Sequence, residues 1–168
     1  MNLLEVIPSK KFYIFVSNFL LGILFALSFE PFKVPFLSLL TIGIYFLMNE
    51  YVFQKFKSHY KYFFYNGIFF GYGFFLLSMY WVSNSILELD SKLFYIAPLI
   101  LIFFPLFLST FFGLMQIINA LLWSENNSKI FYFSALWAIF EFLRSIVLSG
   151  LPWNLLGYSW SWSLSYSQ

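Results

Sequence analysis

The sequence predicts an all-α integral membrane protein, a bundle of about five transmembrane helices with a structured outer-side loop at the C-terminus. Of the 168 residues, 61% are hydrophobic and only 10% are charged, which is too apolar for a soluble domain of this size to cover with polar surface. Apolar runs of about 18 residues or more recur along the chain, and each can cross a hydrocarbon core of about 30 Å. The chain is therefore expected to span a membrane several times.

The first two spans are expected at about 12–29 and 35–48. Between them lies the short connection EPFKVP, in which Pro31 and Pro35 bias the chain away from helix. The second run ends at the polar and basic stretch NEYVFQKFKSHYK. Basic residues ahead of the first run resemble the start of a signal peptide, but no A-x-A-like cleavage site follows the run. We interpret it as an uncleaved span, with a cleaved signal as the alternative.

The remaining spans are expected at about 62–82, 93–123 and 130–148. The run 93–123 carries no charge, and it is too long for one upright helix but too short for two spans of about 20 residues with a turn. We expect one tilted or bent helix there, because Pro98 and Pro105 each lack an N–H and offer a place for a bend.

The placement of basic residues predicts the orientation of this module. The N-terminal tail and the loops after the second and fourth spans share one side, which holds Lys10, Lys11, Lys55, Lys57, Lys61 and Lys129. The opposite side holds Lys33 and Lys92, with Arg144 near it. Because basic residues favour the cytoplasm, the N-terminus is expected to be cytoplasmic, and 149–168 is expected to be an interfacial segment on the outer side. Dividing the fourth run into two spans would invert this last segment.

Composition also excludes several kinds of site. The net charge is only +2, and the basic residues are spread over loops, so nucleic acid is not an expected partner. The chain contains no cysteine, which rules out disulfides, thiolate metal sites and a cysteine nucleophile within these residues. His59 lies among lysines without a second histidine or a carboxylate cluster, so neither a metal site nor a cofactor is expected.

Glu141 and Arg144 interrupt the last apolar run close to its outer end. At i, i+3 spacing they are neighbours on one helix face, and a charge facing lipid there would cost about 1 to 3 kcal/mol. We expect both side chains to face inward. An ion pair that locks the helix to its neighbours and a contact with substrate head groups are equally compatible with this position.

The residues that follow the charged pair indicate a break in the helix at an interface. Gly150 can end the helix, and Pro152 prevents its resumption. Several amphipathic aromatic residues of the kind that settle at a membrane interface come next, namely Trp153, Tyr158, Trp160 and Trp162. Anchoring in the interface is the simplest role for these rings.

Small and polar residues inside the runs predict helix packing. The stretch GIFFGYG holds Gly67, Gly71 and Gly73 at small-xxx-small spacing, which lets another helix approach closely. Polar side chains inside the spans are expected to form interhelical hydrogen bonds more often than they contact substrate, and these are Asn18, Gln116 and Asn119.

Three stretches, in order, resemble the apolipoprotein N-acyltransferase family. The segment EFLRSIVLSGLPWNLLGYS is similar to the family pattern E-[FW]-L-R-x-x-x-x-[ST]-G-[FL]-P-W-x-x-x-G-Y-S. The stretch LLGILFALSFEPFKVPFLSLL resembles the family's first span and turn, and GIFFGYGFFLLSMYWVSNSI resembles its third span. The resemblance makes a set of residues candidates for lipid-substrate contact or a structural role, namely Glu141, Arg144, Gly150, Pro152, Trp153, Gly157 and Tyr158.

The resemblance implies a bacterial inner-membrane enzyme that finishes lipoprotein maturation. It implies transfer of a fatty acyl chain from a phospholipid, through a cysteine thioester, to the α-amine of a diacylglyceryl-cysteine. In the family a Glu, a Lys and a Cys of a nitrilase-like outer domain carry this chemistry, and none of them can be assigned here. We therefore expect a truncated membrane portion, inactive alone, with a separately encoded catalytic half as one option.

Two other interpretations remain open at the level of sequence. One is a nonfunctional gene remnant that still inserts into the membrane. The other is a small multi-span transporter or membrane scaffold that uses the proline-bent fourth span and the Glu141 and Arg144 pair as a polar site. The three ordered stretches disfavour the transporter.

Overall fold

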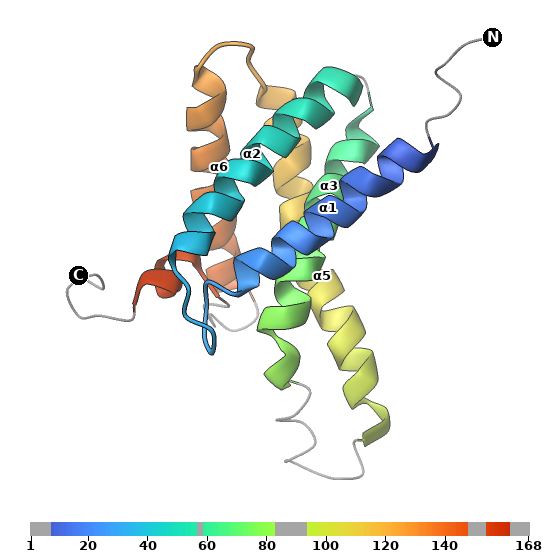
Figure 1. Ribbon diagram of the computed structural model, residues 1–168, viewed down its shortest axis with the longest axis vertical. Coiled ribbons are helices and arrows are strands. Elements are labelled where there is room, and N and C mark those ends of the chain that lie inside the picture. The colour runs from blue at the N-terminus through green and yellow to red at the C-terminus, as the bar shows by residue number, and fades with distance from the viewer. Residues whose placement is uncertain (1–7, 57–58, 83–93, 148–153, 162–168) are drawn as a thin grey trace.

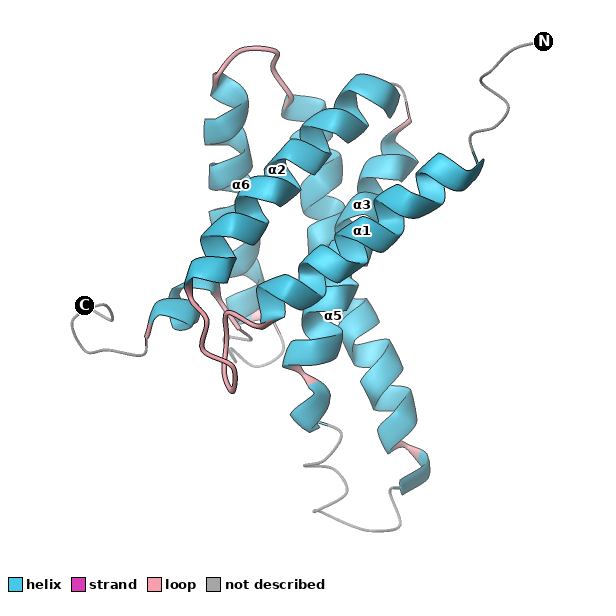
Figure 2. Ribbon diagram, viewed as in Figure 1, coloured by secondary structure: helices cyan, strands magenta, loops and turns pink. Residues whose placement is uncertain are grey.

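The computed structural model describes residues 8–56, 59–82, 94–147 and 154–161, and these form helices and connecting turns without any strand (Figure 1). Successive long helices run in alternating directions, and Figure 2 distinguishes the helices from the described loops and turns. The elements are α1 (Pro8–Ala26), α2 (Phe36–Phe56), α3 (Tyr60–Ser78), α5 (Ala97–Leu122), α6 (Ser128–Ile146) and the short 3-10 helix η2 (Leu156–Trp160). The all-helical prediction is confirmed for this part of the chain.

Each predicted span overlaps one long helix, and two of these helices meet a simple test for crossing a membrane. Among the described residues, α2 and α5 are long and apolar enough to cross a membrane, with mean hydropathies of 1.5 and 2.2 over 18 residues. The apolar part of α1 is shorter and covers Phe12–Ala26. The fourth run forms the single helix α5, with Pro98 in its first turn, where its missing N–H costs no hydrogen bond, and Pro105 inside.

The helix α3 lies at the centre of the packing, in contact with α1, α2 and α5, while α1 also contacts α2 and α5 also contacts α6. The core between these helices is rich in aromatic rings. Phe70, which is fully buried, stacks on Tyr45 at 3.9 Å between ring centroids and meets Phe112 edge-on at 5.4 Å. Such ring pairs add about 0.5–1.5 kcal/mol beyond the apolar area that they bury.

Glycines allow α3 to approach its neighbours backbone to backbone. A Cβ added at Gly67 would overlap the carbonyl group of Phe112 and lie 2.7 Å from the Cα of Gly113, both in α5. One added at Gly73 would overlap the carbonyl oxygen of Phe19 in α1. Gly71 also faces α5, where a Cβ would lie 3.0 Å from the Cα of Ser109. The three glycines of GIFFGYG thus lie at two different helix contacts.

Buried amides join three of the helices. Asn18 in α1 donates a hydrogen bond of 2.6 Å to the Oδ1 of Asn66 in α3, and Asn66 donates to Asn49 in α2. The interhelical bond expected of Asn18 is therefore present. Asn119 donates a hydrogen bond of 3.1 Å to Gln116 within α5, because an i, i+3 spacing brings the two side chains together on one helix face.

Candidate functional site

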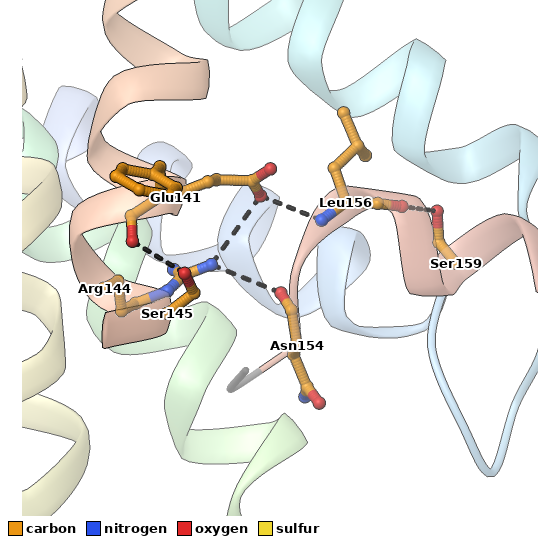
Figure 3. A network of polar contacts seen from close by, with 7 residues as sticks. Glu141, Arg144, Ser145, Asn154, Leu156 and Ser159 are labelled. Atoms are coloured by element: carbon orange, nitrogen blue, oxygen red, sulfur yellow. Dashed lines mark hydrogen bonds and ion pairs between the residues drawn. The ribbon is translucent and has the colours of Figure 1, made fainter. Parts of the chain in front are cut away.

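Arg144 lies near the end of α6 and is buried, with 2% of its surface exposed. Its guanidinium carbon lies 4.9 Å from the ring centroid of Phe75 and 5.6 Å from that of Phe112, positions in which an aromatic face attracts a cation. Its Nη2 lies 3.6 Å from the Oε1 of Glu141, one turn earlier in the helix. Glu141 and Arg144 are thus neighbours, as the sequence predicts, and they form an inward-facing ion pair (Figure 3).

The same two side chains also bind the backbone of the segment 154–161. The N–H of Leu156 donates a hydrogen bond of 2.8 Å to the Oε1 of Glu141. Arg144 donates from Nη2 to the carbonyl oxygen of Asn154 at 3.3 Å. Figure 3 shows these contacts converging between α6 and the segment. We call Glu141, Arg144 and their two backbone partners the loop clamp.

A second contact ties this segment to α2. The indole N–H of Trp160 donates a hydrogen bond of 3.2 Å to the hydroxyl of Ser38 near the start of α2. The ring of Trp160 also meets Phe36 edge-on, with centroids 5.6 Å apart. The helix η2 is therefore fastened to α6 at one end and to α2 at the other.

Only some of the residues expected at the site lie in the part of the chain that the structure describes. Glu141 and Arg144 come together, whereas Gly150, Pro152 and Trp153 lie outside the described residues. Gly157 is exposed, and a Cβ added there would meet no atom within 4 Å.

Three further residues are partners of the site that the sequence does not predict, namely Asn154, Leu156 and Ser38. The first two take part through backbone atoms, which leave no signal in the pattern of side chains. The third is a serine far away in sequence, and nothing in its local pattern marks it.

Tyr158 borders a cavity of about 470 Å³ at the end of the bundle that holds the loop clamp. Three segments form its wall: the turn around Glu30, the residues from the end of α3 at Ser78 to Trp81, and the segment from Asn154 to Ser161. Glu30 forms an exposed ion pair of 2.8 Å with Lys33 at its edge. The three sequence stretches that carry the family resemblance therefore meet at one cavity.

The opposite end of the bundle carries another ion pair, between Lys129 at the start of α6 and Glu50 in α2. Lys129 also lies 5.8 Å from the ring centroid of Trp123. This contact joins α2 and α6 far from the loop clamp.

Two helices of membrane-spanning length, close glycine contacts and a buried ion pair are typical of a helical membrane-protein module. Residues 21–168 match the model of the apolipoprotein N-acyltransferase N-terminal domain, and the chain belongs to this family.

Curated relatives agree with this family. The apolipoprotein N-acyltransferase of Rickettsia typhi is 33% identical over 147 residues, which is 86% of this chain and 28% of the relative. That of Rickettsia prowazekii is 34% identical over 146 residues, with the same two coverages. That of Allorhizobium ampelinum is 35% identical over 95 residues, 56% of this chain and 18% of the relative. The chain thus spans less than a third of the length of these relatives.

Proposed function

We propose that this chain serves as the membrane part of an apolipoprotein N-acyltransferase, which transfers a fatty acyl chain from a phospholipid to the N-terminal diacylglyceryl-cysteine of a lipoprotein. The observation that carries the proposal is the cavity at which the three family-like stretches meet, around Glu30, Trp81 and Tyr158. Its role would be to hold lipid-bearing substrates. Family membership disfavours the small transporter, and nothing described in the structure favours it.

The proposal places residues 1–168 in a bacterial inner membrane as one five-span module. The helices α2 and α5 support this by length and hydropathy. The helices α1, α3 and α6 have 19 residues each, and about 1.5 Å per residue gives each a length of about 28 Å, close to the thickness of the hydrocarbon core. The segment 149–168 would then lie at the outer interface.

The geometry of the loop clamp supports a positioning role for Glu141 and Arg144. The Nη2 of Arg144 and the Oε1 of Glu141 contact each other and backbone groups of the segment 154–161. An arginine that served a lipid head group would need its donors directed to a site that lipid can reach, whereas Arg144 is 2% exposed. We propose that the pair fixes the path of the chain at the outer interface.

The chemistry that the family resemblance implies needs a thiol from outside these residues. The 168 residues contain no cysteine, and a thioester intermediate requires a thiolate nucleophile. We propose that a catalytic region with Glu, Lys and Cys works together with this module, either in one longer polypeptide or as a separate chain.

A chimera tests the proposed function. In the Rickettsia typhi relative, the segment that matches this chain is replaced by the corresponding residues of this chain. The chimera is expected to N-acylate a diacylglyceryl-cysteine peptide in the presence of phospholipid, as detected by mass spectrometry. The 168-residue chain alone is expected to leave the amine of the peptide free. A folded, membrane-inserted chimera without activity would contradict the proposal, and N-acylated peptide made by the chain alone would contradict the need for an external thiol.

The orientation is tested with reporters fused to the chain. The six lysines on one side predict a cytoplasmic N-terminus and a periplasmic C-terminal segment. Alkaline phosphatase, which is active only in the periplasm, is expected to be active when fused after Gln168. A fluorescent protein that folds only in the cytoplasm is expected to be dark at the same position, and a bright fusion there would refute the orientation.

A further inference from the structure

The short helix η2 has three faces, and two of them meet different parts of the structure. A 3-10 helix has three residues per turn, so residues three apart lie on one face. Tyr158 and Ser161, the residue that follows η2, both line the cavity of about 470 Å³. Leu156 and Ser159 face the core instead, where Leu156 packs against the buried cluster and Ser159 is buried. The rotation of η2 about its own axis therefore decides whether Tyr158 faces the cavity.

The third face of η2 carries Gly157 and Trp160. Gly157 has no side chain, and a Cβ added there would meet no atom within 4 Å, so the side-chain contacts of this face come from Trp160. Its indole N–H donates to the hydroxyl of Ser38 at 3.2 Å, and its ring meets Phe36 edge-on. Both partners belong to the first turn of α2. Trp160 thus joins η2 to a long helix of the bundle.

Ser38 is a well-fixed acceptor for this bond. The residue is fully buried, and its own O–H donates a hydrogen bond of 2.6 Å to the carbonyl oxygen of Pro35. A hydroxyl group has one proton and two lone pairs, so the oxygen can accept from Trp160 while its proton is held by Pro35. A buried oxygen held in this way fixes the direction of the indole N–H.

The contacts at the other end of η2 leave its rotation less constrained. Glu141 and Arg144 bind the backbone at Leu156 and Asn154, at the start of the segment. Trp160 lies about 8 Å further along the axis of η2, at about 2.0 Å per residue. Contacts near one end of a short helix act as a pivot, whereas an added contact at the far end also fixes the rotation.

We propose that Trp160 is a positioning residue for the cavity at Tyr158. Its hydrogen bond to Ser38 fixes the rotation of η2, and this directs the Tyr158 side chain at the polar part of a bound substrate. Trp160 is not one of the residues that line the cavity, so it acts through Tyr158. The inference rests on the proposed function, which places a lipid-bearing substrate in this cavity. Because the thiol chemistry takes place outside these residues, the effect falls on substrate binding.

Kinetics of the Rickettsia typhi chimera test the positioning role. Trp160→Phe keeps an aromatic ring but removes the N–H, and it is expected to raise the KM for phospholipid about fivefold, the effect of losing one neutral hydrogen bond, with kcat unchanged. Tyr158→Phe, which removes the hydroxyl at the cavity, is expected to raise KM in the same way. A residue that only stabilised the fold would reduce the amount of active enzyme, and so lower the apparent kcat while KM stayed the same.

Thiol labelling of the 168-residue chain measures how firmly η2 is held, without any need for activity. The chain contains no cysteine, so Ser159→Cys introduces a single thiol at a position that is 3% exposed. This thiol is expected to react slowly with a maleimide in detergent. Adding Trp160→Phe is expected to speed the reaction about fivefold, because one hydrogen bond that opposes local opening is lost. Tyr158→Phe is expected to leave the labelling rate unchanged.

The matched control is Trp123→Phe, the same chemical change at the opposite end of the bundle, where the ring stacks on Phe53. It is expected to change neither the KM nor the labelling rate. Ser38→Ala added to Trp160→Phe is expected to have no further effect on labelling, because the two residues act through one bond.

Unchanged labelling in the Trp160→Phe variant would overturn the role of Trp160 in holding η2. Faster labelling together with an unchanged KM in an active chimera would overturn its positioning of Tyr158, as would a fall in kcat alone. Loss of activity in the wild-type chimera would contradict the proposed function instead, and labelling would still decide whether Trp160 holds η2. The two failures are therefore distinguishable.

Discussion

Replacing Gly67 by alanine is expected to destabilise the bundle by about 1–3 kcal/mol, the usual cost of forcing an extra methyl group into a well-packed core. The added Cβ would overlap the carbonyl group of Phe112 and lie 2.7 Å from the Cα of Gly113. These are backbone atoms of α5, so no side-chain rotation can relieve the overlap, and α3 must move away from α5. Thermal unfolding in detergent, followed by circular dichroism, measures the loss.

Gly43→Ala is the matched control, because it makes the same chemical change in the interior of α2 where no atom lies within 4 Å of the added Cβ. Alanine in a helix interior is favoured over glycine by about 0.5–1 kcal/mol, so this variant is expected to be as stable as the wild type or slightly more stable. Unchanged unfolding of Gly67→Ala would show that α3 and α5 do not pack as closely as the structure places them.

Hydropathy located the helices because it reports which segments can be buried in lipid or against other helices. It located their ends less well. The second span was expected to end at 48, whereas α2 continues to Phe56. Asn49 marked an end to the apolar pattern, but its side chain accepts a hydrogen bond from Asn66 and the helix passes through it unbroken. A polar residue ends an apolar run without ending a helix when a neighbouring helix supplies its partner.

The candidate site was only partly predictable for a related reason. The spacing of Glu141 and Arg144 predicts that they are neighbours, because it depends only on the helix repeat. Their partners depend on how the chain turns back after the helix, which sets the position of the Leu156 N–H and the Asn154 carbonyl. Every residue carries such groups, so their use cannot be read from side chains. The hydrogen bond from Trp160 to Ser38 requires the tertiary packing of α2.

Breaking the ion pair in the loop clamp is expected to have the largest effect on stability. Glu141→Gln leaves the Arg144 guanidinium, which is 2% exposed, without a counter-charge. Arg144→Met leaves a carboxylate whose side chain is 17% exposed and an unpaired carbonyl at Asn154. Removing one partner of a buried pair costs about 3–5 kcal/mol. We expect the Glu141→Gln loss to be the larger of the two, because the charge that it strands is the more deeply buried.

The double variant, Glu141→Gln with Arg144→Met, is expected to recover much of the stability that either single change loses. An apolar side chain can replace a buried charge without the cost of desolvation, and the glutamine oxygen can still accept from the Leu156 N–H. Thermal unfolding of the two single variants and the double variant in detergent measures the coupling between the residues. In the Rickettsia typhi chimera, a stable double variant that has lost activity would show that the charges also act on substrate, contrary to a purely positioning role. Additive losses with no recovery would show that the two residues do not stabilise the fold as a pair.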